Sequence, residues 1–169
     1  MFKVIDIDPN VLESLNEDVK KHYVSNGVSI FQKNVEAQIN ANLVGRIGEY
    51  YFQELFPKAV KIDCHDYDFI SNCEKVDVKT KKSAGIVREY YTCDIPAYST
   101  KIQKNDSYFF FIVNKELTKL TVIGRISKQD FIKESKFFTK GTLVERNGYN
   151  YRVDTYSIEV GKINEKNKI

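Results

Sequence analysis

The chain has 169 residues, 42% of them hydrophobic and 29% charged, a composition typical of a soluble globular domain that excludes a disordered or low-complexity protein. Its 26 basic and 23 acidic residues leave a net charge of +3, which permits a polyanionic partner without requiring one. The N-terminus is too short and too acidic for a signal peptide, and no apolar run has membrane length. We therefore expect an intracellular protein, cytoplasmic or otherwise, that is not secreted and has no membrane partner.

Two helices are predicted in the first third of the chain. Residues 10–24 carry apolar side chains at helical spacing, and a second, longer pattern covers roughly residues 31–56. The second helix should stop at Pro57, because proline cannot continue the hydrogen bonds of a helix. Glu49 shares a stripe of this helix with Phe52, so its side chain should face the protein.

Three short strands are predicted next, because β-branched and aromatic residues alternate there with polar breaks. These strands cover residues 59–62, 67–70 and 75–80. In the third strand, successive side chains point to opposite faces of the sheet. Val76 and Val78 therefore face the core, whereas Asp77 and Lys79 share the other face.

The middle of the chain is predicted to continue with strands and one short helix. The expected elements are a tyrosine-rich strand at 86–94, a helix at 98–104, a continuously apolar buried strand at 108–114 and its neighbour at 120–126.

The C-terminal part should form an appendage on this core. Ser127 and Asp130 have the spacing of a capping box and predict the start of a short helix. Asn147-Gly148 predicts a two-residue hairpin turn within residues 143–153. We therefore expect one domain over residues 1–169, with a core at about 31–126, a C-terminal helix and hairpin at 127–160, and a frayed tail at 161–169.

The pair of acids around the second predicted hairpin is the most informative feature of the sequence. If the strands pair across residues 71–74, Asp68 lies directly opposite Asp77. Like charges held opposite each other destabilise a sheet, and a cation between them would remove that cost. Oxygen ligands suit Mg²⁺ or Mn²⁺. Asp66 lies on the same strand face and would replace Asp68 if the register shifted.

The three cysteines, Cys64, Cys73 and Cys93, are an odd and sparse set that fits reduced thiols better than disulfides. A zinc site built from them with His65 lacks the short two-residue spacing of structural zinc sites. We expect three small, half-buried hydrophobic side chains.

The order of Glu49 on a helix, Asp68 on a strand and Asp77-Val78-Lys79 on the next strand resembles the PD-(D/E)XK nuclease superfamily. The resemblance covers residues 44–80 and implies a restriction-endonuclease-like α/β fold, whose central mixed sheet is flanked by helices. The triplet recurs by letter at residues 18–20 and 134–136. Both copies fall in or beside predicted helices, where residues two apart cannot share a face.

The resemblance implies a metal-dependent DNA endonuclease that hydrolyses phosphodiester bonds. Asp68 and Asp77, with the backbone carbonyl of Val78, would hold Mg²⁺ or Mn²⁺, and Lys79 would assist the attacking water. Glu49 would contact a metal-bound water or a second metal. Substrate DNA would be contacted by nearby polar and cationic residues, with tyrosines between them. These residues are Lys81, Lys82, Arg88, Lys101, Gln103 and Lys104.

Three alternatives follow from the same residues. Asp77 and Lys79 could be an exposed salt bridge on a solvated strand. The enzyme could instead be a Holliday-junction resolvase, which would work as a homodimer with paired active sites. The chain could also be a non-catalytic nucleic-acid-binding module on the nuclease architecture, although such a module has little reason to keep two opposed carboxylates.

Overall fold

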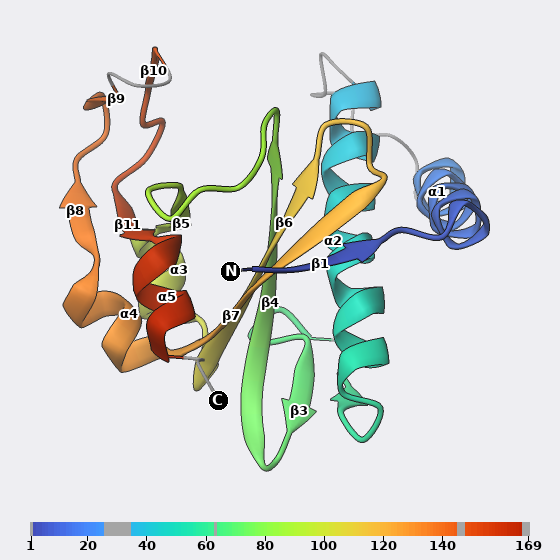
Figure 1. Cartoon of the computed structure of the whole chain (residues 1–169), viewed down its shortest axis with the longest axis horizontal. Coiled ribbons are helices and arrows are strands. Elements are labelled where there is room, and N and C mark those ends of the chain that lie inside the picture. Colours follow the sequence, from blue (N-terminus) through green and yellow to red (C-terminus); the bar gives the residue numbers. More distant parts are fainter. Residues whose placement is uncertain (1, 26–34, 63, 145–147, 167–169) are drawn as a thin grey trace.

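The computed structural model of the chain describes residues 2–25, 35–62, 64–144 and 148–166, and its centre is a mixed sheet (Figure 1). The strands of this sheet are β1 (Lys3–Asp6), β2 (Val60–Lys61), β3 (Phe69–Ser71), β4 (Glu74–Ser83), β6 (Ser107–Asn114) and β7 (Lys119–Ser127). They are ordered β1-β7-β6-β4-β3-β2, with β4 and β6 parallel and the other neighbours antiparallel. The prediction of an α/β protein with a mixed central sheet is therefore confirmed.

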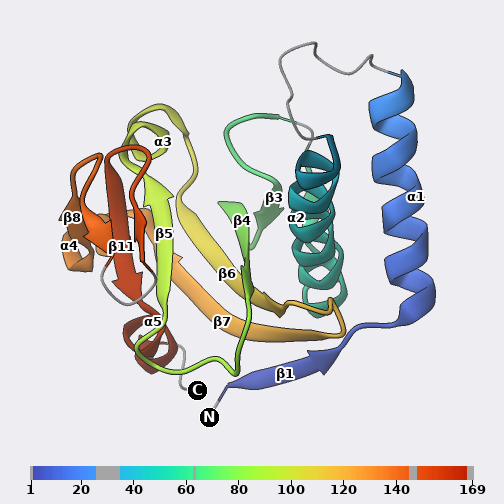
Figure 2. The ribbon, with the colours of Figure 1, turned by 90° about the horizontal axis from the view of Figure 1, so that it is seen from above.

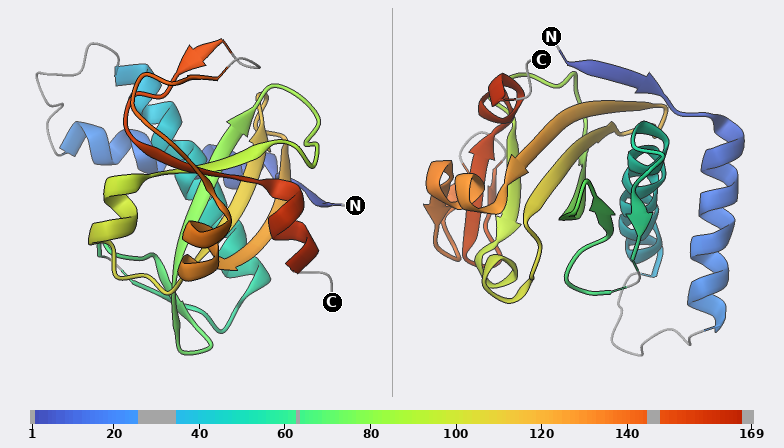
Figure 3. Two further views of the ribbon diagram at one scale, coloured as in Figure 1. Left: turned by 90° about the vertical axis from the view of Figure 1, so that its left-hand side faces the viewer. Right: turned by 90° about the horizontal axis from the view of Figure 1, so that it is seen from below.

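Long helices cover one face of the central sheet, and a second sheet lies against the other face (Figure 2, Figure 3). The helices found among the described residues are α1 (Pro9–Ser25), α2 (Val35–Leu55), α3 (Ala97–Ile102), α4 (Lys128–Glu134) and α5 (Val160–Lys166). The second sheet has the order β5-β11-β8 and is built from β5 (Thr92–Pro96), β11 (Thr155–Glu159) and β8 (Lys136–Phe138). A separate hairpin pairs β9 (Leu143–Val144) with β10 (Tyr149–Asn150).

Two hydrophobic cores form on opposite faces of the central sheet. On the α2 side, Ile47 and Phe52 pack with Val76, Val78 and neighbouring sheet residues. The other core lies between the two sheets and holds the side chains of Cys93, Ile95, Tyr108, Phe110, Ile112, Phe131 and Ile158. Strand β6 contributes alternate side chains to both cores, which explains why its sequence is apolar without interruption.

Helix α2 approaches β4 closely because it carries glycine at the crossing point. A Cβ atom at Gly48 would lie 1.8 Å from the Oγ1 of Thr80 on β4. The equivalent atom at Gly45 would meet nothing within 4 Å. The side chain of Thr80 therefore occupies the space that a side chain at position 48 would need.

Local patterns located most elements of the core. Helix α1 agrees with the prediction for residues 10–24, and α2 ends at Leu55, just before Pro57. The first four residues predicted for the second helix, 31–34, lie outside the described residues. Ser127 caps α4 as predicted, because its side chain accepts a hydrogen bond of 3.0 Å from the amide of Asp130.

The predictions for residues 86–94 and for the C-terminal part differ from the structure. Strand β5 begins only at Thr92, because Tyr91 closes a turn by donating its amide to the carbonyl of Arg88. Residues 161–166, where a frayed tail was expected, belong to α5, since Val160 and Ile163 are buried in the core between the sheets. Strands β1, β8 and β11 were not predicted.

The turn between β9 and β10 also differs from the predicted two-residue turn. Tyr149 pairs with Val144, so residues 145–148 separate the two strands. Asn147 itself lies outside the described residues.

Candidate functional site

The hairpin of β3 and β4 has the register that the sequence predicts. Phe69 pairs with Val76 and Ile70 with Lys75, and this register directs Asp68 toward Asp77. The turn is tighter than the predicted loop at residues 71–74, because Ser71 already pairs with Glu74. Both turn residues, Asn72 and Cys73, adopt positive φ angles of 52° and 64°, as a two-residue hairpin turn of type I′ requires.

Asp68 lies just beyond the end of this ladder and binds β4 with its side chain. Its carboxylate accepts a hydrogen bond of 2.7 Å from the backbone amide of Val78, and its own amide donates to the carbonyl of Val76 at 3.0 Å. The N–H and C=O of one residue in a strand point toward the same neighbour. The carbonyl of Val78 is therefore directed to the side on which Asp68 lies.

Asp77 lies on the opposite face of β4 from the two valines and is only 2% exposed. The ammonium of Lys79 is 2.9 Å from its Oδ1 and 2.8 Å from its Oδ2. The geometry at Oδ2 is that of an ion pair without a hydrogen bond, and no described residue donates one to this buried oxygen. Burial of Asp77 rules out an exposed salt bridge on a solvated strand.

The two carboxyl groups influence each other strongly. Burial and then the negative charge of Asp77 raise the pKa of Asp68 to about 7, although the hydrogen bond from Val78 acts in the opposite direction. The charge of Glu49 and a hydrogen bond that protonated Asp68 can donate to Asp77 contribute to the same rise. Without a cation, the pair of acids therefore keeps a proton up to nearly neutral pH.

The side chain of Glu49 extends from α2 toward the acid pair, but its carboxylate forms ion pairs with two basic side chains. Its Oε2 is 2.9 Å from the Nζ of Lys61 on β2 and 3.2 Å from an Nη1 of Arg46. Neither partner was predicted from the sequence. Arg46 could have been found from its i,i+3 spacing to Glu49, whereas the contact with Lys61 depends on the pairing of β2 with the sheet.

The residues at this site fit a hard divalent cation that keeps part of its water shell. The described residues contain no group of three His, Cys, Asp or Glu side chains arranged to hold a metal ion. Oxygen ligands are nevertheless present. They are the two carboxyl groups that retain a shared proton, including a buried Asp77 oxygen without a hydrogen bond, and the carbonyl of Val78. Mg²⁺ is commonly bound through one or two carboxylates together with water and substrate phosphate.

The other residues singled out in the sequence fall into two groups along β4. Gln103 follows α3 and donates its side-chain amide to the carbonyl of His65 at 3.5 Å, close to the segment that contains Asp66 and Asp68. Lys101 and Lys104 are exposed in the same region. Asp66 is half-buried and precedes the ladder, so Asp68 is the acid that contacts β4.

The second group lies at the far end of β4. Lys81 is half-buried and forms an ion pair of 2.6 Å with Asp94, while Lys82 and Arg88 are exposed. The structure therefore brings Asp68, Asp77 and Lys79 together, with Glu49 nearby. It separates the predicted DNA-contacting residues into two sets.

The three cysteines are free thiols, as predicted. Cys93 is buried, and burial raises the pKa of its thiol above the usual range. Cys64 and Cys73 are exposed, so the expectation that they are half-buried is wrong.

Comparison with known proteins leaves the site to be judged on its own geometry. No protein-family model matches the chain, and no curated protein sequence matches it. None of the helices in the described ranges is both long enough and apolar enough to cross a membrane.

Proposed function

We propose that this protein is a metal-dependent DNA endonuclease with a restriction-endonuclease-like core. The observation that carries the proposal is the acid pair at the end of the β3–β4 ladder. At this site burial, and then the charge of the buried Asp77, raises the pKa of Asp68, and Lys79 adjoins the pair. Strongly perturbed carboxyl groups beside a fixed cation are typical of functional sites.

The arrangement of the elements around the pair supports the same proposal. Helix α2 carries Glu49 toward the hairpin, the hairpin carries the two acids, and β6 runs parallel to β4 as the following strand of the sheet. The sheet is mixed and has helices on one face. These are the features that the resemblance to PD-(D/E)XK nucleases implies.

The residues of the site have complementary tasks in phosphodiester hydrolysis. Asp68, Asp77 and the Val78 carbonyl would hold a divalent cation, which would offset charge on the phosphate and activate a water. Lys79 is fixed by Asp77 but is 37% exposed, so its ammonium can also meet a phosphate oxygen. In that position it stabilises the negative charge that develops in the transition state.

Glu49 has a supporting role beside the acid pair of Asp68 and Asp77. Its carboxylate lies near enough to Asp68 to raise the pKa of that group, yet its direct partners are Arg46 and Lys61. We assign it to holding α2 and β2 beside the site and to binding water at the cation. A change at Glu49 should therefore reduce cleavage less than a change at Asp77.

The test is cleavage of supercoiled, linear, single-stranded and branched DNA in Mg²⁺ or Mn²⁺ by the parent chain and by Asp77→Asn. Loss of a ligand that costs ~3 kcal/mol in the transition state lowers the rate about hundredfold. The matched control is Asp18→Asn, because Asp18 begins a triplet of the same letters within α1.

The proposal expects the parent and Asp18→Asn to cut at equal rates and Asp77→Asn to be at least about hundredfold slower. Equal cutting by all three proteins would refute it. Calorimetric titration with Mn²⁺ gives a second measurement. Absence of heat with the parent, together with absence of cleavage, would favour a non-catalytic binding module.

A further inference from the structure

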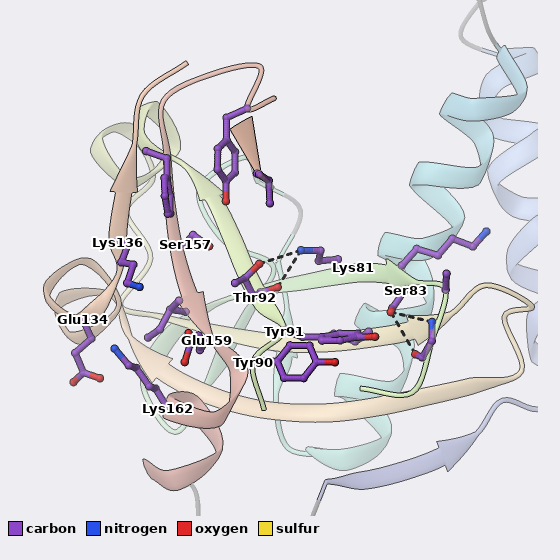
Figure 4. Close-up of a pocket in the computed structure, with 18 of the residues that line it drawn as sticks. Lys81, Ser83, Tyr90, Tyr91, Thr92, Glu134, Lys136, Ser157, Glu159 and Lys162 are labelled. Atoms are coloured by element: carbon purple, nitrogen blue, oxygen red, sulfur yellow. Dashed lines mark hydrogen bonds between the residues drawn. The ribbon is translucent and has the colours of Figure 1, made fainter. Parts of the chain in front are cut away.

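A cavity of about 880 Å³ opens between the central sheet and the second sheet, away from the acid pair (Figure 4). One wall comes from the end of β4 and the connection to β5, and includes Lys81 and Tyr91. The other wall comes from the C-terminal part of the chain, and includes Lys136, Ser157 and Lys162. Residues that are remote in sequence thus build one cleft.

The charged side chains of this cleft favour an anionic ligand. Four lysines line it, namely Lys81, Lys82, Lys136 and Lys162, against two acids, Glu134 and Glu159. Lys81 is neutralised by Asp94 and donates to the carbonyl of Thr92 at 3.0 Å. The other three lysines form no ion pair with any residue in the described part of the chain. Their charge is available to phosphate groups.

The cleft also presents aromatic rings and an apolar floor. Tyr90, Tyr91, Phe138 and Tyr151 line it, above the buried side chains of Ile112 and Ile158. Tyr90 is 48% exposed, and its ring centroid lies 5.3 Å from that of Tyr91. In Figure 4 these two rings lie below Lys81 of β4 and to the right of Lys162 of α5. Cations combined with accessible rings are typical of sites that bind unpaired nucleotides.

Lys81 connects the cleft to the acid pair. Asp77, Lys79 and Lys81 alternate along β4 and therefore point to the same face of the sheet. Asp77 and Lys81 are four residue steps apart along the strand, a span of about 13 Å. A strand of nucleic acid bound at Asp77 can thus follow this row of side chains into the cleft within a few nucleotides.

We propose that the cleft binds an unpaired segment of the substrate strand, so that the preferred substrates are single-stranded, tailed or branched DNA. Bases inside a duplex stack on one another, and only unstacked bases can use protein rings. The volume of the cleft suits a small number of nucleotides. The inference rests on the proposed nuclease function for its position along the strand, but the binding it predicts requires no metal.

The experiment is fluorescence anisotropy with the full chain in EDTA, using a labelled oligothymidylate and a labelled duplex of equal length. Tyr90→Ala should weaken binding of the oligothymidylate about tenfold, whereas Tyr90→Phe, which keeps the ring, should bind like the parent. Phe137→Ala is the matched control. Phe137 is 50% exposed on β8, but alternation points it away from the cleft-lining Lys136 and Phe138.

The lysines give an independent measurement. Replacement of Lys136 and Lys162 together by alanine should weaken binding and reduce the dependence of log Kd on log salt by about 1.4, whereas Lys20→Ala on the distant α1 should change neither. The inference would be overturned if the parent bound the duplex as tightly as the oligothymidylate. It would also be overturned if the cleft variants bound the oligothymidylate as tightly as their controls do. Binding that survives Tyr90→Ala and is displaced by inorganic phosphate would also overturn it, because the cleft would then be only an anion site.

These outcomes separate the two proposals. If the parent cleaves DNA and the cleft variants bind like their controls, the nuclease function stands and the cleft inference fails. If the cleft variants lose binding in EDTA and the parent never cleaves, the reverse holds.

Discussion

Replacement of Gly48 by alanine should destabilise the protein, whereas the same replacement at Gly45 should not. Both glycines lie in the interior of α2, where alanine is favoured over glycine by up to about 1 kcal/mol. This gain is common to both variants and cancels when they are compared. The difference in free energy of unfolding then reports only what each new methyl group meets.

The structure supplies the sign and size of that difference. The new Cβ at position 48 would lie 1.8 Å from Thr80 Oγ1 and 3.1 Å from Thr80 Cβ, whereas at position 45 it meets open space. Relief requires rotation of Thr80 or a shift of α2 away from β4. Overpacking of this kind costs about 1–3 kcal/mol. Gly48→Ala should therefore be less stable than Gly45→Ala by about that amount.

Urea denaturation followed by circular dichroism measures both variants against the parent. The same pair is then compared in a Thr80→Ala background, which removes the clashing hydroxyl. This hydroxyl has no hydrogen-bond partner among the described residues, so its removal should itself cost little. Equal free energies of unfolding for the two glycine variants in the parent background would refute the reasoning. A difference between them that stays as large in the Thr80→Ala background would refute it too.

Two further predictions concern the charged groups on the face of β4. In metal-free buffer the parent should be less stable at pH 8 than at pH 5, because folded Asp68 keeps a proton up to about pH 7 that the unfolded chain releases near pH 4. Urea denaturation at both pH values should show a smaller loss of unfolding free energy between pH 5 and pH 8 in Asp68→Asn than in the parent. An equal loss in the two proteins would show that another group causes it. Lys81→Met should lower the free energy of unfolding by about 1–3 kcal/mol, because Asp94 would lose its ion pair while remaining largely buried. Lys82→Met, on the exposed neighbour, should change stability by less than about 0.5 kcal/mol, and equal effects of the two changes would contradict this assignment.

Local sequence patterns located the central hairpin and the face on which its charges lie. Side chains alternate along β4, so Asp77 and Lys79 had to share one face once Val76 and Val78 faced the core. The short interval between the strands fixed the pairing of Phe69 with Val76, and with it the direction of Asp68. These relations involve residues close in sequence, and for that reason the chain alone contains them.

The second sheet could not be found in the same way. Strand β8 covers only Lys136–Phe138, and β5 and β11 are also short, so each offers too little pattern to be recognised. Their pairing joins segments around positions 94, 137 and 157. Such contacts arise only when the segments pack over the central sheet.

The sequence by itself therefore determined the identity and spacing of the acids, their strand setting and the cap of α4. The tertiary structure decided how those acids behave. Asp77 is only 2% exposed in the folded chain, and burial, followed by the charges of Asp77 and Glu49, raises the pKa of Asp68. The cleft beside Lys81 exists only where residues 81–91 meet residues 134–162. Burial and charge coupling depend on distances in space, which local periodicity does not contain.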